Sequence, residues 1–202
     1  IPSLFAFNEA LVASDGLEAK MGTLTADWPR FSPWRTIDGR KIADDLLPGL
    51  QVLLQGAFAP HRLLDLVRNF VAFESQGPSV AKKMAAYHQY CAVNAAVDQT
   101  LQAASPGGDR KVGVVWHTQG SGKTYTMIKA AEMLFKAPKH EKPTILLLID
   151  RNELEDQMIK NLRSLVINNV EHAYTIARLN ELLRSDYRGI IVTMIHKFRD
   201  MP

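Results

Sequence analysis

The sequence is poor in cysteine and in long apolar runs. Its single cysteine, Cys91, cannot form an internal disulfide, which fits a reducing compartment. No apolar run reaches the roughly 18 residues expected of a membrane-spanning helix, and no basic stretch followed by an apolar one opens the chain, so neither a membrane partner nor a signal peptide is predicted. Cys91 falls in a stretch that we expect to be helical, where a core residue is the simpler interpretation than a nucleophile.

The net charge of +3 is modest, but it is distributed unevenly along the chain. Residues 1–75 carry 7 Lys and Arg against 9 Asp and Glu, and residues 76–202 carry 17 against 12. The basic half favours a polyanionic partner. A solvated basic surface with no partner explains the same charge equally well.

One stretch in the basic half combines an apolar run, a glycine-containing turn and the start of a helical pattern. It reads Val112-Gly113-Val114-Val115-Trp116 and then His117-Thr118-Gln119-Gly120-Ser121-Gly122-Lys123-Thr124. Strand, glycine turn and helix in this order predict a phosphate-binding loop, because glycines let backbone N–H groups approach a phosphate where a Cβ would collide. His117 replaces the first glycine of the pattern G-x-x-x-x-G-K-[ST], whereas its second half is intact.

The residues after the second glycine indicate the ligand. Lys123 can reach the β- and γ-phosphates, the Thr124 hydroxyl can ligate Mg²⁺, and the helix start adds unpaired N–H groups. A glycine-rich turn before an ordinary helix does not explain Lys and Thr directly after Gly122. We therefore predict a site for a nucleoside triphosphate with Mg²⁺, formed by Thr118, Gln119, Gly120, Ser121, Gly122, Lys123 and Thr124.

Strand and helix patterns alternate through the second half of the chain. We expect a strand at 112–116, a helix at 122–136, a strand at 144–149, a helix at 151–165, a helix near 175–184 and a strand at 189–193. Strands that are apolar throughout are typical of parallel sheets covered on both faces. The pattern predicts an α/β fold with a doubly wound parallel sheet and a ligand site beyond the carboxyl ends of its strands.

Arg151 follows the strand expected at 144–149, at the edge of the sheet where ligands bind. An arginine beside helix N–H groups suits a nucleic-acid phosphate. A solvated arginine is the alternative.

The first 78 residues show two regions. Residues 1–36 read as strands around a turn at 14–16, and residues 42–74 read as helices in which Arg62 and Arg68 are most simply solvated. A polar Gly-Pro stretch at 74–79 is the best candidate for a domain boundary.

Three charged residues in the first region superficially resemble the carboxylate–lysine element of metal-dependent nucleases. They are Asp15, Glu18 and Lys20. Asp15 precedes Glu18 by only three residues and sits in the turn, so charged side chains on the solvated face of a hairpin are the better interpretation.

Four segments occur in the order of superfamily-2 helicase motifs: Tyr87-His88-Gln89-Tyr90, residues 116–124, residues 149–157 and residues 191–198. Together they resemble the restriction subunit of type I restriction–modification enzymes, which combines a motor with a nuclease. The His-Thr-Gln-Gly-Ser-Gly-Lys form of the loop is similar to that family's, and so is the stretch 1–8 with Ser14-Asp15-Gly16. The family tolerates a non-glycine residue at the position of His117.

The resemblance implies a role for each matching residue. Gln89 corresponds to the glutamine that reads the adenine edge, for which an amide offers a donor and an acceptor side by side; a glutamine that merely starts a helix is the alternative. Lys123 and Thr124 correspond to the catalytic phosphate and Mg²⁺ ligands. Arg151, Thr193 and Lys197 correspond to residues that contact the DNA strand being tracked, although β-propensity alone would also place a threonine at 193.

The resemblance also implies an organisation. Residues 1–40 would be strands of an α+β nuclease-like domain, 41–78 a helical linker, and 79–202 part of a RecA-like P-loop lobe. ATP and Mg²⁺ would be the cofactors. The partners would be double-stranded DNA and the modification and specificity subunits, and the location a bacterial or archaeal cytoplasm.

No Asp-Glu-x-His motif and no second motor lobe occur, and the chain begins at Ile1 without Met. We therefore expect a fragment of a longer subunit that hydrolyses little ATP by itself. The main prediction is part of an ATP-dependent DNA translocase and endonuclease. Another superfamily-2 helicase or remodelling motor and a non-catalytic ATP-binding scaffold remain open.

Overall fold

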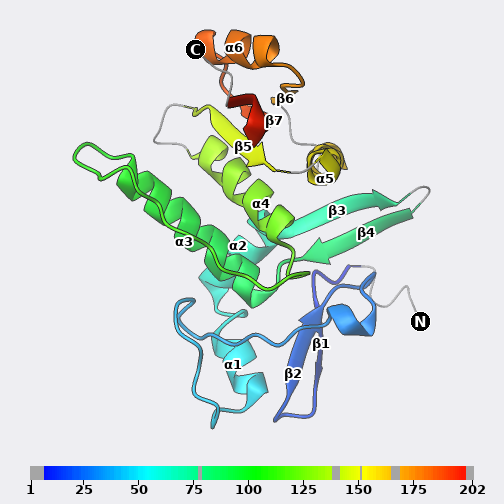
Figure 1. Ribbon diagram of the computed structural model, residues 1–202. Helices are drawn as coiled ribbons and strands as arrows, with labels where there is room; N and C mark the ends of the chain where they lie inside the picture. Colours follow the sequence, from blue (N-terminus) through cyan, green and yellow to red (C-terminus); the bar gives the residue numbers. More distant parts are fainter. Residues whose placement is uncertain (1–6, 77–78, 138–141, 151, 165–168, 199–202) are drawn as a thin grey trace. The chain divides into compact units, whose positions relative to one another are not determined.

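The computed structural model describes residues 7–76, 79–137, 142–150, 152–164 and 169–198 (Figure 1). The chain divides into two compact units, Ile1–Ala96 and Val97–Pro202. The division falls within helix α3 (Tyr87–Ala103), which includes Cys91 and the stretch around it that we expect to be helical.

Two antiparallel hairpins and short helices make up the first unit. Strand β1 (Leu11–Ser14) pairs with β2 (Ala19–Gly22), and β3 (Val71–Gln76) pairs with β4 (Ser79–Met84). A 3-10 helix (Trp28–Arg30), α1 (Gly49–Gln55) and α2 (Pro60–Asn69) lie between the hairpins in sequence. The predicted boundary at 78 therefore falls between two paired strands, and β4 is a strand that the sequence patterns did not predict.

Aromatic rings form the centre of the first unit. The ring of Tyr90 lies 4.7 Å from that of Phe70 and 5.5 Å from that of Trp34, measured between centroids. A Cβ at Gly56 would lie 2.2 Å from the carbonyl oxygen of Thr36, so only glycine permits this close approach. Burial, with a further contribution from Asp65, raises the pKa of Tyr90 above its usual range, so the phenol stays neutral.

The prediction that Arg62 is solvated is wrong. Arg62 is only 5% exposed, and its Nη1 donates hydrogen bonds to the carbonyl oxygens of Ile37 (2.8 Å) and Gly56 (2.6 Å). The amphipathic pattern of α2 could not reveal this, because the two acceptors belong to main chain outside the helix. Arg68, on the same helix, is exposed as predicted.

A three-stranded parallel sheet organises the second unit. Its order is β5 (Ile145–Ile149), β7 (Ile190–Met194), β6 (Val170–His172). The helices are α4 (Lys123–Lys136), α5 (Asn152–Ser164) and α6 (Ile176–Arg184), each within two residues of its predicted bounds. The short strand β6 was not predicted.

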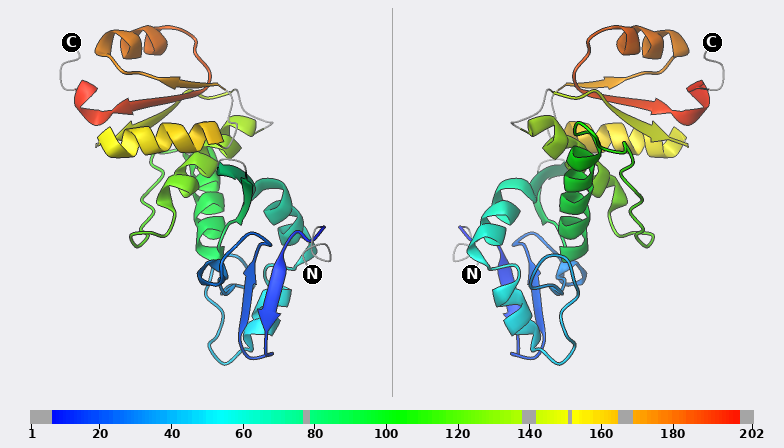
Figure 2. Two further views of the ribbon diagram at one scale, coloured as in Figure 1. Left: turned by 90° about the vertical axis from the view of Figure 1, so that its right-hand side faces the viewer. Right: turned by 90° about the vertical axis from the view of Figure 1, so that its left-hand side faces the viewer.

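Helices cover both faces of this sheet. Alternate residues of β7, namely Ile190, Val192 and Met194, pack with residues of α4 and α5, whereas Ile191 packs with Leu179 and Leu182 of α6. Figure 2 shows α5 and α6 on opposite sides of the strands. All five residues of β7 are buried, so the predicted two-sided burial is confirmed for this strand.

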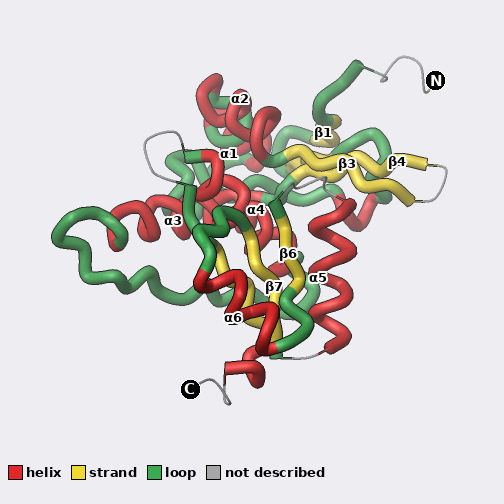
Figure 3. Tube along the Cα trace, turned by 90° about the horizontal axis from the view of Figure 1, so that it is seen from above, coloured by secondary structure: helices red, strands yellow, loops and turns green. Residues whose placement is uncertain are grey.

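Two predictions about the sheet are wrong. Residues 112–116 form no strand, and Figure 3 draws the segment between α3 and α4 as loop. Val114 and Trp116 are each 90% exposed, because no strand among the described residues pairs with this run and an apolar run alone does not satisfy backbone hydrogen bonds. Strand β5 lies at the sheet edge, where Leu148 is 45% exposed rather than buried.

Candidate nucleotide-binding site

The loop between residues 117 and 122 contains two glycines in the left-handed conformation. Gly120 has φ 79° and Gly122 has φ 81°, both in the left-handed region that favours glycine. Nothing lies within 4 Å of the position that a Cβ at Gly120 would take. The glycines at these two positions are therefore explained by backbone conformation.

Lys123 turns its side chain back into the loop. Its Nζ donates to the carbonyl oxygens of His117 (3.0 Å) and Thr118 (2.8 Å), while Ser121 Oγ donates to the same Thr118 oxygen at 2.8 Å. Lys123 is exposed, as are Thr118, Gln119 and Gly120. The ammonium group thus lies against the backbone of a loop whose residues 118–120 are accessible to solvent.

Helix α4 begins at Lys123, one residue after the predicted start. Gly122 is the residue before the helix, and its carbonyl accepts from Thr126 N at 3.1 Å, so the first turn is formed. Lys123 is the first residue of this helix, so its ammonium group and the positive end of the helix dipole belong to the same short segment. Both favour a bound anion.

Gln89 is the third residue of α3 and belongs to the first unit. Its Oε1 accepts from the backbone N–H of Ala86 at 3.0 Å, which is one half of a capping box. This arrangement is the helix-start role that the sequence left open. Its role in adenine binding stays a prediction.

The three residues predicted to contact DNA have different positions. Arg151 lies outside the described residues. Thr193 is fully buried in β7, and its Oγ1 donates to Ala173 O at 3.2 Å. Lys197, in the 3-10 helix Ile195–Phe198, is 8% exposed and donates to the same oxygen at 2.7 Å.

Glu155 and His172 are two further polar residues at this edge of the sheet. Glu155 lies in α5 and is 8% exposed, and its Oε1 lies 2.8 Å from His172 Nε2 at the end of β6. Glu155 falls within the motif-like segment 149–157 and His172 in none of the four segments, so only the missed strand β6 could have pointed to the pair.

Asp15 is occupied by the turn between β1 and β2. Its Oδ1 accepts from the backbone N–H groups of Leu17 (3.0 Å) and Glu18 (2.8 Å), and Lys20 Nζ lies 5.1 Å from the centroid of the Trp28 ring. These contacts agree with charged side chains on the solvated face of a hairpin rather than with a nuclease centre. Across the described ranges, no group of three or more His, Cys, Asp or Glu residues could hold a metal ion.

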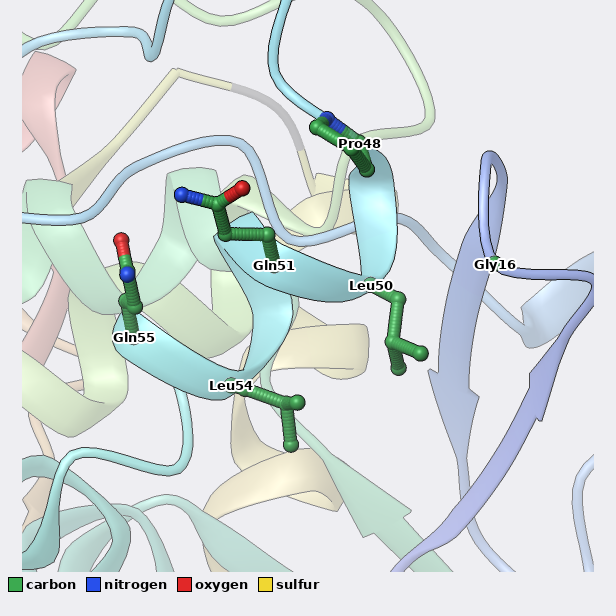
Figure 4. Close-up of a pocket in the computed structure, with 6 residues that line it drawn as sticks. All are labelled: Gly16, Pro48, Leu50, Gln51, Leu54 and Gln55. Carbon is green, nitrogen blue, oxygen red and sulfur yellow. The ribbon is translucent and has the colours of Figure 1, made fainter.

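Cys91 and a groove beside α1 are the other features of the first unit that could carry chemistry. Cys91 is half-buried, and burial raises the pKa of its thiol, which lowers the thiolate fraction as expected of a structural cysteine. A groove beside α1 has no ionisable lining side chain (Figure 4); it is lined by Gly16, Pro48, Leu50, Gln51, Leu54 and Gln55.

In the part of the chain with described structure, no helix is long and apolar enough to cross a membrane.

Comparison with known proteins bears on both the loop and the surrounding fold. Residues 88–202 match the SWI2/SNF2 ATPase family, a stretch that includes the loop and every strand of the parallel sheet. The chain belongs to this family. The prediction of a helicase-like, ATP-binding class is thereby confirmed.

The resemblance to the restriction subunit is also confirmed. The chain is 42% identical over 206 residues to the type I restriction enzyme HindI endonuclease subunit of Haemophilus influenzae, covering 98% of this chain and 19% of that protein. A type I restriction enzyme endonuclease subunit of Methanocaldococcus jannaschii is 34% identical over 217 residues, covering 98% and 20%. One from Staphylococcus aureus is 27% identical over 148 residues, covering 73% and 15%. The chain spans about a fifth of the length of the first two relatives.

Proposed function

We propose that this chain is part of the ATP-driven motor of a type I restriction endonuclease subunit. It would belong to a RecA-like, doubly wound P-loop lobe that binds ATP with Mg²⁺ and works on double-stranded DNA. The observation that carries the proposal is the loop before α4, with its two left-handed glycines and the Lys123 ammonium turned inward. The family match over residues 88–202 supports the same lobe.

Each part of the loop has a chemical task in this proposal. Lys123 would leave the two loop carbonyls and pair with the β- and γ-phosphates, and the N–H groups of residues 118–122 and of the first turn of α4 would surround them. Thr124 would ligate Mg²⁺ through its hydroxyl. Gln89 would read the adenine edge.

The carboxyl edge of the sheet is the proposed DNA side. Arg151, Thr193 and Lys197 follow or end strands β5 and β7 there, and residues 76–202 carry the excess of basic side chains. The partners would be the modification and specificity subunits, in a bacterial or archaeal cytoplasm. Residues 1–40 are proposed as the end of a nuclease-like domain and 41–78 as its linker to the motor.

The experiment is an equilibrium titration of the intact subunit with ATP and Mg²⁺. We expect Lys123→Ala to weaken binding by about a hundredfold, because the phosphates lose a charge-assisted partner. Lys136→Ala, which removes an exposed lysine from the other end of α4, is the matched control and should bind as wild type. Equal affinities in the two variants would refute the assignment of this loop.

A second titration tests whether Gln89 recognises the adenine base of ATP. Gln89→Ala should lose the preference for ATP over GTP while keeping phosphate binding. Undiminished discrimination would leave Gln89 with its capping role alone.

A further inference from the structure

A buried polar cluster lies at the carboxyl edge of the sheet in the second unit. It consists of Glu155, His172, Thr193, Lys197 and the carbonyl group of Ala173. The side chains of Glu155, His172 and Lys197 are 11%, 7% and 10% exposed. Ionisable groups are rarely buried to this extent unless they are paired, so the cluster needs its internal contacts.

The Ala173 carbonyl joins two segments of chain. It follows β6 directly and accepts from Lys197 Nζ at 2.7 Å and from Thr193 Oγ1 at 3.2 Å. These two donors use both lone pairs of the oxygen. The backbone N–H of Ala173 in turn donates to Val192 O at 3.0 Å. The chain after β6 is therefore fixed to β7 and to the 3-10 helix that follows it.

Glu155 brings the third segment into the cluster. Its Oε1 lies 2.8 Å from His172 Nε2 and 3.7 Å from Lys197 Nζ, so one carboxylate faces two basic groups. Glu155 lies in the first turns of α5, and Arg151 immediately precedes that helix. Removing the lysine would leave the carboxylate with only the imidazole, in a site that water hardly reaches.

We propose that Lys197 is a positioning residue: it holds the segments after β6 and β7 to α5, and it acts on DNA through them rather than by touching a phosphate. The inference rests on the proposed motor function. A side chain that is 10% exposed and donates to a main-chain oxygen at 2.7 Å would have to break both of its contacts to reach DNA.

The test uses the intact subunit assembled with its modification and specificity subunits. It has two readouts, the DNA-stimulated rate of ATP hydrolysis and the salt dependence of DNA affinity. We expect Lys197→Met to lower the DNA-stimulated rate by about tenfold, and the double variant Glu155→Gln, Lys197→Met to be no slower than Lys197→Met, because groups in one cluster are not additive. The salt slope of binding should be unchanged. Lys160→Met, at an exposed lysine of α5, controls for the loss of one positive charge.

A phosphate contact would give the opposite results. Lys197→Met would then reduce the salt slope by about 0.9 for the lost contact, and its effect would add to that of Glu155→Gln. Lys197→Arg separates the two roles even if Lys197→Met fails to fold. An arginine would still bind a DNA phosphate, so a phosphate contact would be kept. The buried space around Lys197 Nζ holds an ammonium group, so the larger guanidinium group would disrupt the positioning role.

The outcomes also separate this inference from the proposed function. A wild-type subunit that shows no DNA-stimulated hydrolysis when assembled with its modification and specificity subunits would overturn the motor function and, with it, the DNA role of Lys197. A fully active wild type with additive variants and a reduced salt slope would overturn the positioning role alone.

Discussion

Replacing Arg62 by methionine removes two hydrogen bonds from the interior of the first unit. The guanidinium donates to the carbonyl oxygens of Ile37 and Gly56 at 2.8 and 2.6 Å, and the residue is 5% exposed. Methionine keeps the apolar stem of the side chain but leaves both oxygens without this donor. Hydrogen bonds to a charged group contribute roughly 1.5–3 kcal/mol each, and the contributions overlap at one site, so we expect a loss of about 3 kcal/mol in the free energy of unfolding.

The matched control is Arg68→Met on the same helix. Arg68 is exposed, so its replacement should change stability by less than about 0.5 kcal/mol. Native-state hydrogen exchange of the α2 amides in the intact subunit measures both variants at the same sites. Equal exchange free energies in Arg62→Met and Arg68→Met would refute the conclusion that Arg62 is a structural residue.

The remaining predictions concern the second unit. Burial opposes ionisation of Glu132, but its bonds to Lys129 and Lys136 outweigh it and lower the pKa of the carboxyl. The stability from this group is therefore present above its unfolded pKa and lost as pH falls through its folded pKa, so Glu132→Gln should cost about 0.5 kcal/mol at pH 7 and nothing in acid. A pH-independent difference in α4 exchange would contradict this. Gly122→Ala forces an alanine to φ 81°, a strain of about 1–2 kcal/mol, and should weaken ATP binding about tenfold; unchanged affinity in a titration would show that the turn adapts. Thr175→Ala removes the side-chain acceptor for Arg178 N at the start of α6 and should lower the exchange free energy of that helix by about 1 kcal/mol. An unchanged exchange free energy would show that the Thr175 cap does not stabilise the helix.

Features set by local sequence could be predicted. The helices α3 to α6 and the strands β5 and β7 follow from periodicity and apolar runs, and the left-handed turn before α4 follows from Gly120 and Gly122. The motif residues also predicted the family, which the match over residues 88–202 confirms.

Features set by distant partners could not be predicted. The run 112–116 has the composition of a strand, but pairing decides whether a strand forms, and none of the described strands pairs with it. The burial of Arg62 depends on carbonyl groups of residues 37 and 56. That of Lys197 depends on Ala173, which follows a strand of only three residues that carries no clear pattern.

We propose the loop before α4 as the ATP site of a DNA motor. The most direct measurement is the rate of ATP hydrolysis by the intact subunit, assembled with its modification and specificity subunits, with and without duplex DNA. We predict that wild type is stimulated by DNA and that Lys123→Ala is inactive under both conditions. DNA-stimulated hydrolysis at the wild-type rate in Lys123→Ala would contradict the account.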